Sequence, residues 1–110
     1  MASTRMRRVN EAIREVVAEG ISDELADDPE LGFVTVTEVE TSSDLRHAKV
    51  FVTVLEPEMR ESSLAVLERS AAFLQGQINA QMRLKRTPTL RFVYDETGEK
   101  AARVERLLKP

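Results

Sequence analysis

The stretch Leu45–Leu55 alternates apolar and polar side chains, and this period of two residues is typical of a β-strand with one buried face. Its apolar row consists of Ala48, Val50, Val52 and Val54, and its other face carries His47, Lys49, Phe51 and Thr53. The stretch Gly32–Glu40 is also rich in Val, Thr and Phe, and only residues 41–44 separate the two. We therefore predict an antiparallel pair of strands.

The second face of this strand pair also carries apolar side chains, which the alternation alone would not require. They are Phe33, Val39, Phe51 and Leu55. An exposed apolar surface of this kind favours contact with another surface. We expect partial cover on this face, or a partner.

Apolar residues recur at spacings of three and four before the strand pair, in the pattern of an amphipathic helix over residues 4–26. They are Met6, Val9, Ile13, Val16, Val17, Ile21 and Leu25. The sequence Asp27-Asp28-Pro29 ends this helix. Gly20 lies inside it and weakens it by about 1 kcal/mol relative to Ala, so we expect a kink or a close packing contact there.

A second helical pattern follows the strand pair. It begins at Glu56-Pro57-Glu58, where proline suits a first turn, and it ends before Pro88, because the residue before a proline is disfavoured in helical geometry. The apolar residues of this pattern are Leu64, Leu67, Ala71, Leu74 and Ile78. They fit one helix, or two helices joined end to end between Ser70 and Gly76.

Two further elements complete the predicted order. Residues 89–95 alternate as a third strand, with Leu90, Phe92 and Tyr94 on one face, and the spacing of Ala101, Val104, Leu107 and Leu108 predicts a short last helix. A helical crossover normally joins parallel strands of one sheet. We therefore predict an α+β fold with the order α-β-β-α(α)-β-α, a three-stranded mixed sheet and helices on one face. One domain spans residues 1–110, with residues 1–4 disordered.

The composition excludes several classes of functional site. The 110 residues contain no Cys and one His, which rules out disulfides, thiol nucleophiles, Cys-based zinc sites and histidine triads. The carboxylate pair Asp27-Asp28 fits a helix end, and Glu38 with Glu40 fits a strand face, better than either pair fits a metal site. We interpret His47 as a surface or packing residue. We predict no enzymatic activity, metal or cofactor.

The hydropathy of the chain bears on where it acts. Its longest apolar runs are four residues, whereas a helix needs about 20 to cross a bilayer. The amino-terminal segment lacks the apolar core of a signal peptide. We expect a cytoplasmic protein that does not act at a membrane.

The net charge of −3 conceals two segments of opposite sign. Residues 9–30 contain eight acidic side chains and one basic one, whereas residues 69–94 contain five basic side chains and no acidic one. The basic ones are Arg69, Arg83, Lys85, Arg86 and Arg91. Such a separation suits an anionic partner on one side of the molecule. It equally fits two solvated faces that pair with each other across the fold.

Arg5, Arg7 and Arg8 lie at the start of the first predicted helix, where the helix dipole disfavours each cation by about 0.3 to 1 kcal/mol. Glu11 is placed to pair with Arg7 or Arg8 along the helix. Cations at the positive end of the helix dipole indicate that these arginines bind something outside the helix, such as phosphate. The alternative is a frayed helix end, where water absorbs the cost.

The other basic cluster extends from the end of the second helical pattern into the third strand. Lys85 and Arg86 are expected partly to cap the negative end of that helix. Capping does not explain Arg83 and Arg91, and these two suit contacts to a phosphate backbone.

Three stretches of the sequence carry a resemblance to a known family. They read DPELGFVTVT at residues 28–37, SDLRHAKVFV at residues 43–52 and TPTLRFVYD at residues 87–95, and Arg8-Val9 in the opening helix accompanies them. Together with the order of elements from about residue 5 to residue 108, they resemble bacterial ribosome-binding factor A.

The resemblance implies a type II KH-like domain that binds the free 30S ribosomal subunit and assists late maturation of its 16S rRNA without catalysis. It implies a role in ribosome biogenesis and rRNA processing in the cytoplasm, and in growth in the cold. Family members carry a helix kinked at an Ala-x-Gly element. The matching stretch here is Ser70-Ala71-Ala72, which lacks the glycine, and Gly76 is an alternative kink site.

The basic residues and the resemblance together predict an RNA-binding surface on a monomeric protein whose partner is the 30S subunit with its 16S rRNA. The residues expected to contact rRNA phosphates are Arg5, Arg7, Arg8, Lys49, Arg83, Lys85, Arg86 and Arg91. The alternative hypothesis is a protein–protein adaptor of the same fold that makes no direct contact with RNA.

Overall fold

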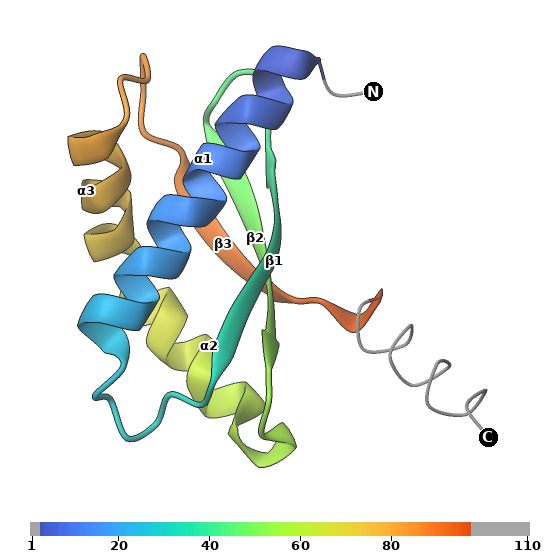
Figure 1. Cartoon of the computed structure of the whole chain (residues 1–110), viewed down its shortest axis with the longest axis vertical. Helices are drawn as coiled ribbons and strands as arrows, with labels where there is room; N and C mark the ends of the chain where they lie inside the picture. The colour runs from blue at the N-terminus through green and yellow to red at the C-terminus, as the bar shows by residue number, and fades with distance from the viewer. Residues whose placement is uncertain (1–2, 98–110) are drawn as a thin grey trace.

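The computed structural model describes residues 3–97, which form three α-helices and a three-stranded sheet (Figure 1). In chain order the elements are α1 (Thr4–Gly20), the π-helical turn η1 (Ile21–Leu25), β1 (Val34–Thr41), β2 (His47–Val54), the 3-10 turn η2 (Pro57–Met59), α2 (Arg60–Arg69), α3 (Ala71–Gln81) and β3 (Thr89–Tyr94). The predicted last helix lies outside the described residues. Of the four residues expected to be disordered, Ser3 caps α1 and Thr4 is its first residue, whereas residues 1 and 2 also lie outside.

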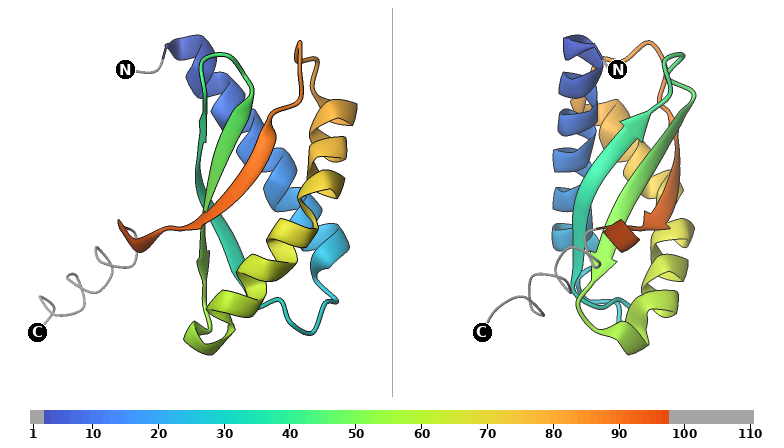
Figure 2. Two further views of the ribbon diagram at one scale, coloured as in Figure 1. Left: turned by 180° about the vertical axis from the view of Figure 1, so that it is seen from behind. Right: turned by 90° about the vertical axis from the view of Figure 1, so that its right-hand side faces the viewer.

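The sheet has the order β1-β2-β3, with β1 and β2 antiparallel and β2 and β3 parallel. The path through α2 and α3 is the helical crossover that a parallel neighbour requires. All three helices lie on the same side of the sheet (Figure 2). The predicted α+β fold, with a mixed sheet and helices on one face, is confirmed.

The core lies between the helices and the inner face of the sheet. Its most deeply buried side chains come from every major element and include Ile13, Val17, Val50, Leu67, Leu74, Ile78 and Leu90. The predicted apolar row of β2 faces this core, and Leu90 and Phe92 of β3 do the same. None of the helices within residues 3–97 combines the length and the apolar character needed to cross a membrane.

The prediction for the outer face of the sheet was wrong at Val39. A β-bulge between Val36 and Glu38 shifts the register of β1, so Val39 pairs with Val50 and is only 3% exposed in the core. An inserted residue reverses the alternation of the strand beyond it, which a strict period of two does not anticipate. Phe33 and Leu55 flank the strands and are 67% and 74% exposed, so residues 3–97 do not supply the expected partial cover there, and the alternative of a partner stays a prediction.

Gly20 marks the point where α1 and α3 pack closely. A β-carbon built on Gly20 would lie 2.7 Å from Cδ2 of the buried Leu74, so the backbone of α1 can approach α3 here only because glycine has no side chain. The helix then widens into η1 directly after this contact. The predicted close packing contact is therefore present.

The long helical pattern divides at Ser70, whose backbone (φ −93°, ψ 1°) leaves the α-helical region between α2 and α3. The helix thus breaks in the stretch Ser70-Ala71-Ala72 although it has no glycine. Gly76, the alternative kink site, lies inside the continuous helix α3, and a β-carbon there would meet nothing within 4 Å.

The two glycines give a paired prediction for stability. Gly76→Ala should raise the free energy of unfolding by about 0.5–1 kcal/mol. Alanine has the higher helix propensity, and its β-carbon at this exposed position would contact no other atom. Gly20→Ala should lower the free energy of unfolding by about 1–2 kcal/mol, because the steric clash of the new methyl group with the buried Leu74 outweighs the gain in helix propensity. Urea unfolding of both variants measures the difference. Equal stabilisation by both would contradict the close contact.

Candidate nucleic-acid interface

The first turns of α1 present the three arginines to solvent. Ser3 caps the helix by accepting the N–H of Met6 at 3.1 Å, so Arg5 lies inside the capped helix and not in a frayed end. Arg5, Arg7 and Arg8 are all exposed, and the first turn contains no acidic residue. Glu11 accepts hydrogen bonds from Arg14 and pairs with neither Arg7 nor Arg8, contrary to the expected pairing.

The connection between α3 and β3 carries the next three cations. Met82 and Leu84 pack against the core, while the intervening Arg83 and the following Lys85 and Arg86 are exposed. The loop is closed by the buried Pro88 and by a hydrogen bond between the side chains of Thr87 and Asn79 (3.2 Å). An anchored loop holds its exposed charges in place, which reduces the ordering cost of binding.

The expected capping role of Lys85 and Arg86 was wrong. Helix α3 ends at Gln81 with no basic residue in its last turn, and the carbonyl of Ile78 accepts the N–H of Met82 (2.8 Å). The chain therefore leaves the helix several residues earlier than the pattern predicted. All three loop cations are left to solvent, and within residues 3–97 none of them has a carboxylate partner within 4.0 Å.

Lys49 and Arg91 lie on the outer face of the sheet, away from the helices. They are register partners on the parallel strands β2 and β3, and both are exposed. On the other side Lys49 pairs in register with Glu40 of β1, which reduces the positive potential there. These two cations therefore form a group separate from the helix start and the loop.

Six of the eight predicted residues gather at one end of the molecule. The start of α1, the β1–β2 connection and the α3–β3 connection all lie at the top in Figure 1, and both views of Figure 2 keep them at the same end. We call Arg5, Arg7, Arg8, Arg83, Lys85 and Arg86 the basic end. Lys49 and Arg91 extend from it down the outer sheet face.

The β1–β2 connection and the first residue of β2 place Arg46 and His47 next to the basic end, neither of them a predicted contact residue, and the Nε of Arg46 lies 3.5 Å from the carboxylate of Asp44. The carbonyl of Arg46 accepts the N–H of Thr89 (2.9 Å), so the connection is tied to the loop before β3. Arg46 and His47 are both exposed. The motif SDLRHAKVFV contains both residues and was the available signal. His47 was predicted to be a surface or packing residue, and no role was predicted for Arg46.

The turn that carries Arg46 is held by a compact set of hydrogen bonds around Asp44. Its Oδ1 accepts from the Ser42 hydroxyl (2.7 Å) and from the N–H of Arg46 (3.0 Å), and these bonds lower the pKa of Asp44 below its ordinary value. Leu45 adopts a left-handed backbone (φ 62°), which is unfavourable for a leucine and is fixed by this turn. The position of Arg46 is therefore set by the turn.

Arg69 does not belong to the basic end. Its guanidinium lies 3.5 Å from the carboxylate of Asp28, in the segment that follows α1, so one cation of the basic segment pairs with the acidic segment across the fold. The remaining acidic residues of η1 and of the following connection lie at the opposite end of the molecule from the basic end (Figure 1). Pairing across the fold thus holds for Arg69, and the anionic partner of the other cations stays a prediction.

The described part of the chain holds no group of three His, Cys, Asp or Glu side chains that could bind a metal ion. His47 lines a shallow hollow on the sheet face together with Glu40 and Lys49.

Comparisons with known proteins agree with this order of elements. A family model described as ribosome-binding factor A matches residues 5–108. A ribosome-binding factor A from Thermodesulfovibrio yellowstonii is 42% identical over 105 residues, which make up 96% of this chain and 88% of that relative. The chain belongs to the ribosome-binding factor A family.

Two structural neighbours of this family extend the comparison to the fold. The crystal structure of ribosome-binding factor A from Thermus thermophilus matches with a TM-score of 0.72 and 26% identity, over 81% of this chain and 94% of that chain. A homology model of the Thermus thermophilus factor, fitted into a cryo-EM map of its complex with 30S, matches with a TM-score of 0.67 and 26% identity, over 79% and 91%. The resemblance and the KH-like fold are confirmed.

The turn around Asp44 gives a prediction for pH dependence. Because hydrogen bonding lowers the pKa of Asp44 in the folded state, it stabilises the turn above the unfolded pKa, and this contribution is lost as pH falls through the folded pKa. Ser42→Ala should move the pKa back toward its ordinary value, as followed by NMR titration of the carboxyl carbon. Ser43→Ala is the matched control and should leave the titration unchanged. An unchanged titration in Ser42→Ala would refute the role of the hydroxyl.

Proposed function

We propose that this protein binds the free 30S ribosomal subunit through rRNA phosphates at its basic end and assists late maturation of the 16S rRNA without catalysis. The observation that carries the proposal is the convergence of the α1 arginines with the loop cations at one end. Membership of the ribosome-binding factor A family supports the ribosome as the partner. The Thermus thermophilus factor was fitted into a map of its complex with 30S, which supports the small subunit as the partner of this protein.

The chemistry of the basic end favours contacts to the RNA backbone over contacts to bases. Its exposed groups are guanidinium and ammonium ions, which bind phosphate, and the start of α1 adds the positive end of a helix dipole. None of its six residues is aromatic, and the ring that the structure places next to it is the imidazole of His47, so stacking on unpaired bases is a minor contribution there. The protein is therefore proposed to recognise the shape and phosphate contour of folded rRNA.

A binding factor without catalytic groups acts on maturation through differential affinity. It stabilises one arrangement of the rRNA by no more than its preference for that arrangement over the alternatives. The rigid attachment of the loop between α3 and β3, through Thr87, Pro88 and the N–H of Leu90 bonded to Gln75 (3.0 Å), suits this mechanism. A fixed array of cations discriminates between phosphate arrangements better than a mobile one.

Binding of the purified full-length chain to 30S subunits at increasing salt tests the phosphate contacts. With about three to five phosphates neutralised, log affinity should fall with log salt at a slope of roughly −2 to −5. Arg83→Gln combined with Arg86→Gln should weaken binding at least about tenfold and make the slope shallower by about 2. Affinity measured by filter binding across the salt series gives both quantities.

The matched control removes two charges elsewhere. Arg14→Gln with Arg69→Gln changes the net charge equally, but these arginines already pair with Glu11 and Asp28 and lie outside the basic end. This double variant should bind almost as the parent does, with an unchanged slope. An equal loss of affinity in both double variants would show that only the net charge of the protein matters, and not the position of the arginines. A salt-independent affinity would instead favour the protein–protein adaptor.

Sedimentation of extract from the organism tests the partner directly. The protein should travel with free 30S subunits and should be depleted from translating ribosomes, because a maturation factor prefers the incomplete subunit. Immunodetection across a sucrose gradient gives the distribution. Migration at the top of the gradient, away from all ribosomal particles, would reject the proposed function.

A further inference from the structure

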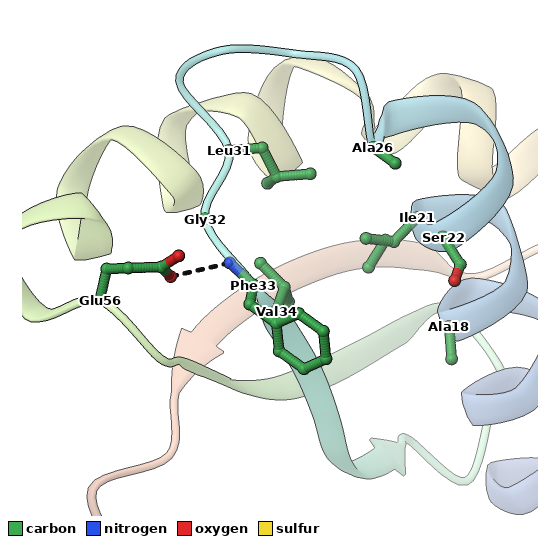
Figure 3. Close-up of a pocket in the computed structure, with 9 residues that line it drawn as sticks. All are labelled: Ala18, Ile21, Ser22, Ala26, Leu31, Gly32, Phe33, Val34 and Glu56. Carbon is green, nitrogen blue, oxygen red and sulfur yellow. Dashed lines mark hydrogen bonds between the residues drawn. The ribbon is translucent and has the colours of Figure 1, made fainter.

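A groove of about 380 Å³ lies at the acidic end of the molecule, remote from the basic end. It runs between the last turn of α1 with η1 on one side and the start of β1 on the other (Figure 3). Its lining combines the apolar side chains of Ala18, Ile21, Ala26, Leu31 and Val34 with a similar share of polar surface. Because β1 is an edge strand of the described sheet, no further strand flanks the groove there.

The β1 side of the groove is held rigidly. The N–H of Gly32 donates to the buried Ser63 hydroxyl (2.8 Å), and the N–H of Phe33 donates to Oε1 of Glu56 (2.8 Å; Figure 3). A β-carbon on Gly32 would lie 2.6 Å from that same Oε1, so glycine is what lets Glu56 reach the strand. Phe33, which also lines the groove, remains 67% exposed. Exposed aromatic residues beside a preformed groove are typical of protein-binding sites.

Acidic side chains surround this apolar surface. Glu56 lines the groove itself, and a second hollow that shares Ala18 and Ser22 with it continues along α1 past Glu15, Glu19 and Arg14, whose guanidinium pairs with Glu11. Within residues 3–97, Glu19 and Glu56 have no cationic partner within 4.0 Å. The rim therefore repels phosphate and attracts cations.

The geometry points to a docking site for a basic polypeptide segment of another protein, which places one or two large apolar side chains in the groove and Lys or Arg side chains against Glu15, Glu19 and Glu56. Charge complementarity selects this occupant. A nucleic acid would meet three carboxylates here against one cation, Arg14, which already pairs with Glu11, and an acidic or neutral peptide would leave the carboxylates unmatched. Since the groove and the basic end lie at opposite ends, one molecule can hold rRNA and a basic protein tail together.

The test uses the full chain and a defined probe. The probe is a short fluorescein-labelled peptide of Lys, Arg and Gly that carries one Phe and one Leu, titrated by fluorescence anisotropy at low salt. A second peptide has Ser in place of Phe and Leu. We expect the first peptide to bind and the second to bind at least about tenfold more weakly, because the apolar contact supplies more than about 1.4 kcal/mol.

Three variants locate the site, and each has a control with the same substitution outside both hollows. Ser22→Arg places a bulky cation in the groove and should weaken binding about tenfold or more, whereas Ser43→Arg in the β1–β2 connection should not. Phe33→Ser should weaken binding, and Leu55→Ser should not. Both side chains are largely exposed, but of the two only Phe33 lines the groove. Glu19→Gln should weaken binding several-fold, and Glu40→Gln should not. Thermal unfolding by circular dichroism verifies that each variant is folded.

Several results would overturn the inference. Equal binding of the two peptides, or equal effects of a variant and its control, would reduce the interaction to unspecific attraction by net charge. A dimer in sedimentation velocity that dissociates on Ser22→Arg would assign the groove to a second copy of this chain. None of these measurements involves the ribosome, so their failure leaves the proposed function untouched, and the reverse also holds.

Discussion

The close approach of α1 to α3 at Gly20 is the constraint on which the helical layer depends. Leu74 is fully buried against the backbone of α1 at this point, in the space that any side chain at position 20 would occupy. The contact joins the first helix of the chain to the helix that precedes the last strand. It thereby fixes how the start of α1 and the loop after α3 lie relative to each other, and those two segments carry the basic end.

The break at Ser70 has a related consequence. Since α2 and α3 are separate helices, Leu67 in the first and Leu74 and Ile78 in the second can all be buried in one core. A straight helix of the same length would not wrap around the twisted sheet in this way. The stretch Ser70-Ala71-Ala72 contains no glycine, and Leu67 and Leu74 are buried on either side of the break.

The charge distribution then follows from the topology. Each end of the molecule collects segments that are far apart in sequence, and the sign of the charge differs between the two ends. Carboxylates of η1 and of the β2–α2 connection lie at one end, and cations of α1 and of the α3–β3 connection lie at the other. Arg69 paired with Asp28 is the exception, where the two segments meet. A small protein with near-neutral net charge can thus offer two surfaces of opposite preference.

Within residues 3–97 the sequence by itself determined the type and order of the elements, because burial on one face imposes a period of two or of about 3.6 whatever the tertiary contacts are. It also identified the cations of the basic end, since their segments contain few acids. The bulge that turns Val39 into the core, the early end of α3 at Gln81 and the inclusion of Arg46 and His47 were decided only in three dimensions. Each depends on contacts between residues distant in the chain. The sequence indicated only the apolar surface at Phe33 and not the groove beside it, because the walls of the groove come from α1, η1, the start of β1 and Glu56, which only packing brings together.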